Sequence, residues 1–378
     1  MAPPYDVIVV GVGGMGSAAA YHLASRGQLV LGLERFTAGH DKGSSHGRSR
    51  VTRQAYHEHP SYVPLVLRAY ELWRQAERDS GRSLLTVTGG VMISDPGAGL
   101  ATGGQRSAEQ WGLPYEILTA PEIRRRFPTL SPADTEVGLY EPNTGFVRPE
   151  ESVLAHSDLA ARAGADLRYG EQVLDWTSDA GGVSVTTTSG RHTAGRLLFC
   201  AGAWSPGLLR ELEVPMVVER QVMHWFEPTG GTAPYESHPI FLWGDTDDEL
   251  IYGFPAHDGD TSVKVAFYRR PHTTDPDHVD RTVHAAEIEE IRDFLAPRVP
   301  SLAGRHATSK ACLYTMTPDH AFVIGHHPGR DNVVVACGFS GHGFKFAPLV
   351  GEVLADLVVD GHTRHDIALF DPTRFATG

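Results

Sequence analysis

The sequence has few cysteines and lacks any long apolar run. Cys200, Cys312 and Cys337 are too few and too scattered among 378 residues for a disulfide framework, which favours a reducing compartment. No uncharged stretch approaches the ~20 residues of a membrane span. Residues 1–4 lack the basic segment of a secretory signal, and residues 375–378 are not a peroxisomal tripeptide. We therefore expect a cytoplasmic protein that does not contact a membrane.

Positive charge is also scarce. The formal net charge of −13 argues against a nucleic acid or an anionic membrane as a partner. Among the 20 histidines, the close pairs His57/His59 and His326/His327 lack cysteine or carboxylate neighbours at zinc-site spacing, so we predict no metal. Ser340 lies outside a GxSxG elbow, which disfavours a hydrolase.

The strongest local pattern is a glycine-rich turn near the start of the chain. Residues 6–10 (DVIVV) predict a buried parallel strand, residues 17–26 a helix that ends before Gly27, and residues 28–33 a second strand. GVGGMG at residues 11–16 joins the first strand to the helix, and Glu34 follows the second strand. Strand, GxGxxG, helix, strand and acid come in the order of a dinucleotide-binding fold.

Each part of this turn has a physical role. Gly11 permits the tight turn, Gly13 lets the backbone approach a pyrophosphate, and Gly16 lets helix and strand pack closely. Glu34 can accept hydrogen bonds from a ribose diol, which disfavours the 2′-phosphate of NADP. The turn itself leaves NAD and FAD both open.

The remaining pattern predicts two interleaved domains. The composition shifts near residue 82, and an apolar strand later ends in the small-residue turn Ala201-Gly202-Ala203-Trp204, where the chain returns to the first domain. We expect a nucleotide-binding domain from residues 1–81, 145–214 and 307–378. We expect a mostly antiparallel-sheet substrate domain from residues 82–144 and 215–306. A chain of this length is too long for one small core.

Three local expectations can be checked in the structure. Residues 61–80 predict a helix with Ser61 as its N-cap, and residues 347–360 predict an apolar helix with an exposed Glu352. Lys264 interrupts the predicted strand 262–268, and pattern alone favours a solvent-facing lysine there.

Three other stretches carry unusual residues: GSSHGRSRVTR at 43–53, KACLYTMTPD at 310–319 and GFSGHGFKF at 338–346. Taken alone, Cys312 is typical of an inert buried thiol, and the glycines are typical of a turn. With GVGGMG, YVPLVLRAYELW and YGFP, however, these stretches resemble the monomeric sarcosine oxidase and N-methyltryptophan oxidase family. These are FAD-dependent amine oxidases of the D-amino-acid-oxidase-like class, and the likeness covers essentially the whole chain.

The resemblance implies a fold and a cofactor. The fold class is α/β plus α+β, with a Rossmann-type FAD-binding domain interleaved with the substrate domain. FAD rather than NAD is the expected cofactor, covalently attached through Cys312. The expected cofactor-binding residues are Gly11, Gly13, Gly14, Met15, Gly16, Glu34, Arg35, Ser44, Ser45, Arg50, Val173, Ala201, Gly202, Trp204, Cys312, Phe339, Gly341, His342, Gly343, Phe344 and Lys345.

The resemblance also implies roles in catalysis. The substrate carboxylate is expected to bind Arg53 and Lys345, because a bidentate arginine and a lysine point charge hold a carboxylate in a fixed geometry. Lys264 is expected to activate oxygen. The expected catalytic residues are Lys264, Arg50, His46, Tyr252 and Tyr314, and the expected substrate-binding residues are Arg53, Lys345 and Tyr268.

The implied reaction oxidises a secondary amino acid to an imine and gives hydrogen peroxide from O2. Ser45 stands where the family often has a second histidine, and Tyr268 stands where the sarcosine-specific members have an active-site histidine. These departures leave the substrate open between N-methyl and cyclic amino acids. The resemblance also implies a monomer. Two other readings are a flavin- or NAD-dependent amine dehydrogenase with another electron acceptor and a non-catalytic nucleotide-binding redox sensor.

Overall fold

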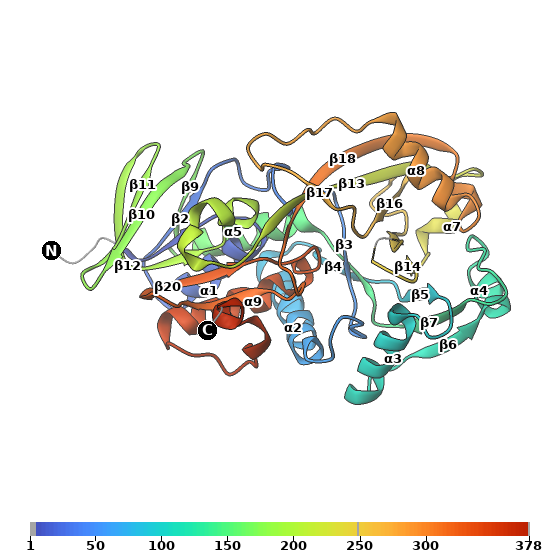
Figure 1. Cartoon of the computed structure of the whole chain (residues 1–378), viewed down its shortest axis with the longest axis horizontal. Coiled ribbons are helices and arrows are strands. Elements are labelled where there is room, and N and C mark those ends of the chain that lie inside the picture. Colours follow the sequence, from blue (N-terminus) through green and yellow to red (C-terminus); the bar gives the residue numbers. More distant parts are fainter. Residues whose placement is uncertain (1–4, 248, 377–378) are drawn as a thin grey trace.

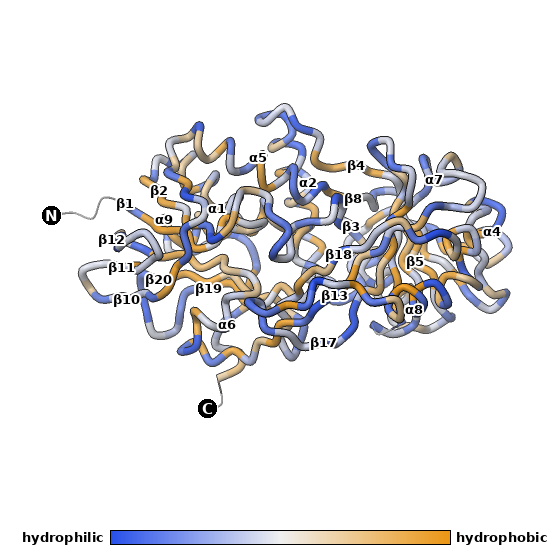
Figure 2. The backbone as a smooth tube through the Cα atoms, turned by 90° about the horizontal axis from the view of Figure 1, so that it is seen from above, coloured by the Kyte–Doolittle hydropathy of each residue, from blue (hydrophilic) through white to orange (hydrophobic). Residues whose placement is uncertain are grey.

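The computed structural model describes residues 5–247 and 249–376. It is elongated, with one large β-sheet at each end and a small sheet between them (Figure 1). Apolar segments are concentrated in the strands of the two large sheets (Figure 2). This arrangement confirms the predicted fold class.

The first large sheet is a mainly parallel nucleotide-binding sheet with the strand order β9–β2–β1–β12–β20–β19. The hairpin β10–β11 extends it from the first half of β12. Its strands are β1 (Tyr5–Val10), β2 (Val30–Glu34), β9 (Asp166–Tyr169), β10 (Val173–Asp179), β11 (Gly182–Thr187), β12 (Gly190–Phe199), β19 (Val323–His327) and β20 (Arg330–Cys337).

Alternation along β1 produces two cores. Val7 and Val9 point into a helix-covered core, whereas Ile8 and Val10 point into a core on the opposite face with residues of β10 and β11. The helices that contribute to the first core are α1 (Gly14–Ser25), α2 (Tyr62–Ser80), α5 (Pro149–Arg162) and α9 (Ala347–Val359). Short turns follow β12, namely η1 (Gly202–Trp204), α6 (Ser205–Leu208) and η2 (Arg210–Leu212).

The second large sheet has the order β17–β13–β16–β15–β14–β5–β7–β6, with β18 paired to β13. Only β14 and β5 run parallel among its described pairs. Its strands are β5 (Gly90–Ser94), β6 (Glu116–Thr119), β7 (Val137–Glu141), β13 (Val217–Glu227), β14 (Ile240–Trp243), β15 (Ile251–Gly253), β16 (Val263–Phe267), β17 (His272–Thr273) and β18 (Arg305–Met316).

Helices and a small sheet complete the second half of the molecule. The helices there are α3 (Gly99–Trp111), α4 (Ala120–Arg126), α7 (Ala233–Glu236) and α8 (Ala285–Leu295). The small sheet has the order β3 (Arg50–Thr52), β8 (Gly145–Val147) and β4 (Leu85–Val87). The remaining single turns are η3 (Pro300–Leu302), η4 (Phe344–Phe346), η5 (Ala368–Phe370) and η6 (Pro372–Phe375).

The domain ranges stay a prediction, and β18 shows where the two sheets meet. Although residues 307–316 were expected in the nucleotide-binding domain, β18 pairs with β13 along the second sheet from Arg305 to Met316. The chain therefore returns to the first sheet only after Met316. One end of β18 lies over the junction between the sheets.

Two details of the helices differ from expectation. Ser61 is the N-cap residue of α2, as predicted, but its side chain forms no capping hydrogen bond. Glu352 on α9 is buried rather than exposed, because Arg68 of α2 and His365 bind its carboxylate at 2.7 and 2.9 Å. These contacts connect α2 to α9.

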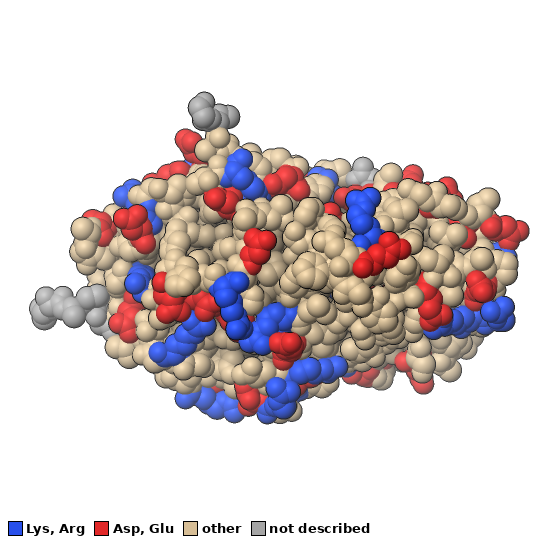
Figure 3. Space-filling view, turned by 90° about the horizontal axis from the view of Figure 1, so that it is seen from below, with Lys and Arg blue, Asp and Glu red and all other residues tan. Residues whose placement is uncertain are grey.

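Charge on the surface is mixed. Basic and acidic side chains lie beside one another on the face drawn in Figure 3. Among the described residues, no helix combines the length and apolar character that crossing a membrane requires.

Candidate active site

A cavity of about 400 Å³ follows the carboxyl ends of the parallel strands β1, β2 and β20. This is the edge of an open α/β sheet where ligands bind. Its walls come from segments 10–15, 33–45, 171–174 and 200–210, and from segment 313–344 at the far end of the chain. The volume lies in the range of small-molecule and cofactor sites.

Two glycines at the end of β1 permit a very close turn. Gly11 has a φ of 88°, and a Cβ there would lie 2.5 Å from the carbonyl oxygen of Cys200. A Cβ on Gly16 would lie 1.8 Å from the Gly11 carbonyl oxygen. At Gly13, by contrast, the nearest atom to such a Cβ is Ser45 Oγ at 3.9 Å. The backbone is therefore tight behind the turn and open toward the cavity.

Glu34 is held at the end of β2 with its carboxylate at the cavity wall. The backbone N–H groups of Val12 and Phe36 donate to it at 2.9 and 3.0 Å, and His40 Nε2 lies 3.3 Å away. Burial acts to raise the pKa of Glu34, but the hydrogen bond from His40 and those from the backbone lower it. The carboxylate is thus ionised and fixed.

Arg35 and Trp204 both bind Asp277, a residue that the sequence analysis did not identify. Asp277 lines the cavity, forms an ion pair with Arg35 and accepts a hydrogen bond from Trp204 Nε1 at 2.8 Å. Asp277 belongs to the segment between β17 and α8, which comes from the second half of the molecule. No sequence signal distinguished it from other surface acids.

Arg50 connects the serine-rich loop to Cys312. Its Nη2 donates to the Ser44 carbonyl oxygen at 2.8 Å and lies 3.3 Å from Cys312 Sγ. Ser44 Oγ donates to the Leu313 carbonyl oxygen at 2.5 Å. The structure therefore places the predicted thiol beside the guanidinium of Arg50, although Cys312 itself does not line the large cavity.

His46 is buried beside this group. Burial and the nearby Arg50 lower its pKa to about 3, so its ring is neutral near pH 7. Neither ring nitrogen has a hydrogen-bond partner among the described residues. Buried polar atoms are normally paired, so these nitrogens indicate room for a further polar group.

Lys264 is buried on β16, so the solvent-facing orientation that pattern alone favoured is wrong. Its Nζ donates to the carbonyl oxygens of Gly47 and Ser49 at 2.8 and 2.6 Å, because the loop before β3 covers this face of the sheet. Nζ also lies 4.7 Å from the Phe254 ring centroid. Burial and Arg50 place the pKa of Lys264 well below its ordinary value.

A second cavity of about 50 Å³ adjoins the large one. Arg50, Tyr314, Gly341 and Phe344 line both cavities. The other predicted site residues around the small cavity are Arg53, Tyr252, Tyr268, His342 and Lys345. Tyr252, Tyr268 and Tyr314 have pKa values raised by burial, so their hydroxyl groups stay neutral.

Arg53 reaches the small cavity with one side of its guanidinium already paired. Its Nη2 contacts Glu58 Oε2 at 2.5 Å and His57 Nδ1 at 2.8 Å. Its Nε is buried and has no hydrogen-bond partner among the described residues. Glu58, which the sequence did not suggest, therefore orients Arg53 while Nε remains able to donate.

Lys345 supplies the second cation. Its Nζ donates to the His342 carbonyl oxygen at 2.6 Å and to the Tyr56 hydroxyl at 3.3 Å. Burial, with the charge of Arg53, places the pKa of Lys345 well below its ordinary value. Tyr56 is a further residue that the sequence did not suggest.

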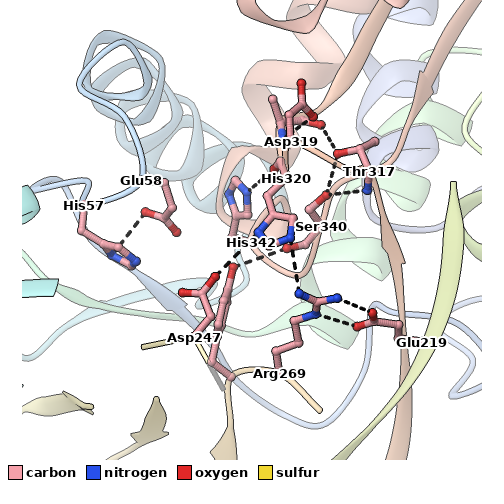
Figure 4. Close-up of polar contacts among 12 residues, drawn as sticks. His57, Glu58, Glu219, Asp247, Arg269, Thr317, Asp319, His320, Ser340 and His342 are labelled. Carbon is pink, nitrogen blue, oxygen red and sulfur yellow. Dashed lines mark hydrogen bonds and ion pairs between the residues drawn. The ribbon is translucent and has the colours of Figure 1, made fainter. Parts of the chain in front are cut away.

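Most predicted cofactor-binding residues line the large cavity, but Gly16, Cys312, His342 and Lys345 do not. His342 and Lys345 line the small cavity instead, and His342 Nε2 contacts the His320 carbonyl oxygen at 3.0 Å (Figure 4). Those that do line the large cavity are Gly11, Gly13, Gly14, Met15, Glu34, Arg35, Ser44, Ser45, Arg50, Val173, Ala201, Gly202, Trp204, Phe339, Gly341, Gly343 and Phe344.

The large cavity fits an extended dinucleotide. One end has the open backbone of Gly13 and the carboxylate of Glu34, which suit a pyrophosphate and a ribose. The other end is lined by Phe339, Phe344 and Tyr314, which suit a flat ring system.

Comparison with known proteins supports this fit. The family model for FAD dependent oxidoreductases matches residues 6–357. A monomeric sarcosine oxidase from Streptomyces avermitilis is 52% identical over 380 residues, covering 100% of this chain and 99% of the relative. An N-methyl-L-tryptophan oxidase from Yersinia pestis is 34% identical, covering 98% of this chain and 99% of the relative.

A solved structure gives the same answer for the fold. NikD, described as an unusual amino acid oxidase essential for nikkomycin biosynthesis, is 27% identical with a TM-score of 0.86, and the likeness covers 97% of each chain. The chain therefore belongs to the FAD-dependent oxidoreductase family, within the group that contains monomeric sarcosine oxidases and N-methyl-L-tryptophan oxidases.

Proposed function

We propose that this enzyme oxidises the C–N bond of a small secondary amino acid, N-methyl or cyclic, with O2 as the electron acceptor. One observation carries the proposal: two buried cations, Arg53 and Lys345, line a small cavity that adjoins the cofactor-sized cavity. The unpaired Nε of Arg53 is a donor for a carboxylate. A carboxylate held there fixes the rest of a small substrate next to the flavin end of the large cavity.

FAD supplies the redox chemistry: when bound, it takes a hydride equivalent from the carbon beside the amine nitrogen and passes the electrons to O2, leaving an imine and hydrogen peroxide. The residues proposed to hold it are Gly11–Gly16 and Glu34 at the nucleotide end and Phe339–Phe344 at the ring end. Cys312 is proposed to attach it covalently, because its Sγ lies 3.3 Å from Nη2 of Arg50, which lines the large cavity.

The small cavity limits the substrate. Its volume of about 50 Å³ holds only a few water-sized groups. Leu242 and Leu250 complete its wall beside the tyrosines, so the part of the substrate away from the carboxylate meets apolar and neutral groups. A compact N-methyl or cyclic amino acid fits these limits better than one with a large aromatic side chain.

The surroundings also favour the amine in its reactive form. A secondary amine must be neutral to release a hydride equivalent, and the cations Arg50, Arg53 and Lys345 around the cavity disfavour an ammonium ion. The neutral hydroxyl groups of Tyr252, Tyr268 and Tyr314 accept or donate hydrogen bonds without adding charge.

Lys264 is proposed to assist the reaction with O2. It is buried next to Arg50, and the carbonyl oxygens of Gly47 and Ser49, the Ser49 hydroxyl and the Phe254 ring hold its Nζ as a fixed donor. A fixed positive charge stabilises the negative charge that develops on reduced oxygen.

We also propose a cytoplasmic monomer. Cys200, Cys312 and Cys337 are all free and buried, which suits a reducing compartment. The monomeric state rests on the sarcosine oxidase relatives whose names include it.

A substrate panel tests the proposed function. Purified enzyme is supplied with sarcosine, other N-methyl amino acids, proline and pipecolate, each beside its carboxamide. We expect peroxide formation from one or more of the acids and at most about one hundredth of that kcat/KM from the matching amide, because the amide lacks the charge that Arg53 and Lys345 bind. Equal rates on acid and amide would contradict the carboxylate site.

Acid precipitation tests the covalent attachment. We expect the yellow colour to stay in the pellet of the wild-type protein and to leave with the supernatant for Cys312→Ser. Cys337→Ser is the matched control, because the Cys337 side chain is buried in the apolar core of the first sheet. A colourless wild-type pellet would contradict the role of Cys312.

A further inference from the structure

Tyr56 lies against both cations of the proposed carboxylate site, although it lines neither cavity. The Arg53 guanidinium carbon lies 4.7 Å from the centroid of its ring, and Lys345 Nζ lies 3.3 Å from its hydroxyl oxygen. The side chain is fully buried. One aromatic residue therefore contacts two cations that come from distant parts of the chain.

The hydroxyl of Tyr56 is oriented by His342. His342 Nε2 lies 3.0 Å from the His320 carbonyl oxygen, which can only accept, so Nε2 carries the proton. Nδ1 is then an acceptor, and the Tyr56 hydroxyl donates to it at 2.5 Å. Burial lowers the pKa of His342 to about 3, so the ring stays neutral near pH 7. The lone pairs of the Tyr56 oxygen are thereby directed to other donors, of which Lys345 is one.

The backbone of Tyr56 is fixed on both sides. Glu141, fully buried at the end of β7, accepts hydrogen bonds from the N–H groups of Gln54 at 2.9 Å and Ala55 at 3.2 Å. Ser107 on α3 donates to the Tyr56 carbonyl oxygen at 2.5 Å. Tyr56 therefore cannot shift without breaking contacts with two other elements.

Figure 4 shows what lies on the other side of His342. His320 lies between Asp247 and Arg269, at 3.7 Å from Asp247 Oδ2 and 3.4 Å from Arg269 Nη1. Arg269 in turn forms an ion pair with Glu219 at 2.6 Å. The carbonyl that fixes the tautomer of His342 is thus part of a polar group that joins the loop after β18 to the second sheet.

We propose that Tyr56, oriented by His342, is a positioning residue that holds Lys345 and Arg53 in the geometry that binds the substrate carboxylate. This inference rests on the proposed carboxylate site. Tyr56 touches neither the substrate cavity nor the cofactor cavity, so its effect acts through the two cations. Carboxylate binding should then depend on its hydroxyl, while the redox step should not.

The test measures binding without turnover. Propionate, which has a carboxylate and no amine, is titrated into the FAD-loaded enzyme, and the change in flavin absorbance gives its Kd. Tyr56→Phe keeps the ring and removes the hydroxyl. We expect the Kd of propionate to rise about tenfold, because a hydrogen bond to a charged group is lost. Under anaerobic conditions, the limiting rate of flavin reduction at saturating substrate should stay within about threefold of wild type.

Tyr62→Phe is the matched control. Tyr62 stacks on Tyr56 with ring centroids 4.7 Å apart and is also buried, but among the described residues it forms no hydrogen bond with Lys345 or Arg53. Its Kd for propionate should match wild type. His342→Leu should raise the Kd of propionate as Tyr56→Phe does. In the double variant, the factor by which this Kd rises should be smaller than the product of the two single-variant factors.

Three results would overturn the inference. The first is a Kd for propionate in Tyr56→Phe within twofold of wild type. The second is an equal loss in Tyr62→Phe, which would show a general packing effect. The third is multiplicative effects of Tyr56→Phe and His342→Leu. If wild type itself shows no binding of propionate, the carboxylate site and this inference fail together, which separates that case from failure of Tyr56 alone.

Discussion

At the scale of single residues, Lys264 and Lys345 show how surroundings separate two buried lysines. Both have pKa values lowered by burial and by a neighbouring arginine. Lys264 contacts carbonyl oxygens and aromatic rings behind the loop of Arg50. Lys345 lines the small cavity beside Arg53. Their positions, rather than their residue type, are therefore the basis on which we propose that Lys264 acts on oxygen and Lys345 binds the carboxylate.

Replacing Lys264 tests the first assignment. In Lys264→Met we expect the reaction of reduced enzyme with O2 to slow by roughly 10²–10³-fold, because a fixed donor to developing negative charge is lost. Anaerobic reduction by substrate should change much less. Stopped-flow absorbance measures both rates. Lys310→Met, which changes a half-exposed lysine of β18, is the control. The proposed role of Lys264 would be contradicted if reduced Lys310→Met also reacted slowly with O2, or if reduced Lys264→Met reacted with O2 at the wild-type rate.

The lowered pKa of Lys345 gives a pH dependence with a definite sign. Burial and Arg53 lower this pKa, so the amine loses its proton at a lower pH than an ordinary lysine. Its charge assists carboxylate binding below that pKa and is absent above it. The Kd of propionate should therefore rise as pH increases through the lowered pKa, in a titration from about pH 6 to pH 10.

The Lys345→Met variant tests whether Lys345 causes this pH dependence. It should bind propionate more weakly at the lower pH values and should lack the rise. Glu58 does not cause the rise in Kd, because its pKa lies far below the range of the titration. Burial acts to raise the pKa of Glu58, but the charges of Arg53 and His57 lower it by more. A rise that persists unchanged in Lys345→Met would assign the titration to another group.

At the scale of elements, buried Glu141 connects β7 to the segment that follows β3. It accepts hydrogen bonds from Gln54, Ala55 and Thr144. In Glu141→Ala we expect the free energy of unfolding to fall by about 2–4 kcal/mol, because buried N–H groups lose their partner. Glu141→Gln should lose less. Urea unfolding followed by far-UV circular dichroism measures the change.

The control for Glu141 is an acid on a neighbouring element. Glu109→Ala on α3 removes an exposed carboxylate that accepts hydrogen bonds from Gln105 and Tyr115. Its unfolding midpoint should match wild type. An equal midpoint for wild type and Glu141→Ala would show that water or another side chain replaces the carboxylate.

Elements could be predicted from sequence where periodicity and glycines were strong. The strand, turn and helix around Gly11–Gly16 depend on local patterns, and the structure has them. The predicted N-cap position of Ser61 is confirmed, whereas Glu352 is not the exposed acid that we expected, because its burial depends on tertiary partners. The strand pattern alone also gave the wrong, solvent-facing orientation for Lys264, because the loop that covers this lysine is 215 residues away in sequence.

The site shows the same division. Most of the residues that resemble a known family line one of the two cavities, whereas Gly16, His46, Lys264 and Cys312 line neither. Tyr56, Glu58 and Asp277 could not be found from sequence, because each acts by pairing with a residue brought near only by the fold. Periodicity carries no information about such pairs.

At the scale of the whole molecule, the segment between β17 and α8 crosses from the second half to the cofactor cavity. Asp277 binds Arg35 and Trp204 there. In a Cys312→Ser background, Asp277→Asn should speed FAD release by a few-fold only, because the ion pair is partly exposed. Flavin fluorescence after dilution measures release. Asp275→Asn, which removes the contact with His278 on the same segment, should leave the rate of FAD release unchanged. If Asp275→Asn sped FAD release more than Asp277→Asn, the Asp277 contact would be excluded as the cause.

The most direct measurement of the proposed function follows the flavin band in two stages. Enzyme under nitrogen is mixed with sarcosine, N-methyl amino acids, proline or pipecolate, and air is then admitted. We expect at least one of these to bleach the band, and air to restore it with release of about one equivalent of hydrogen peroxide per flavin. No bleaching by any secondary amino acid, or a band restored only by an artificial acceptor without peroxide, would contradict an amine oxidase.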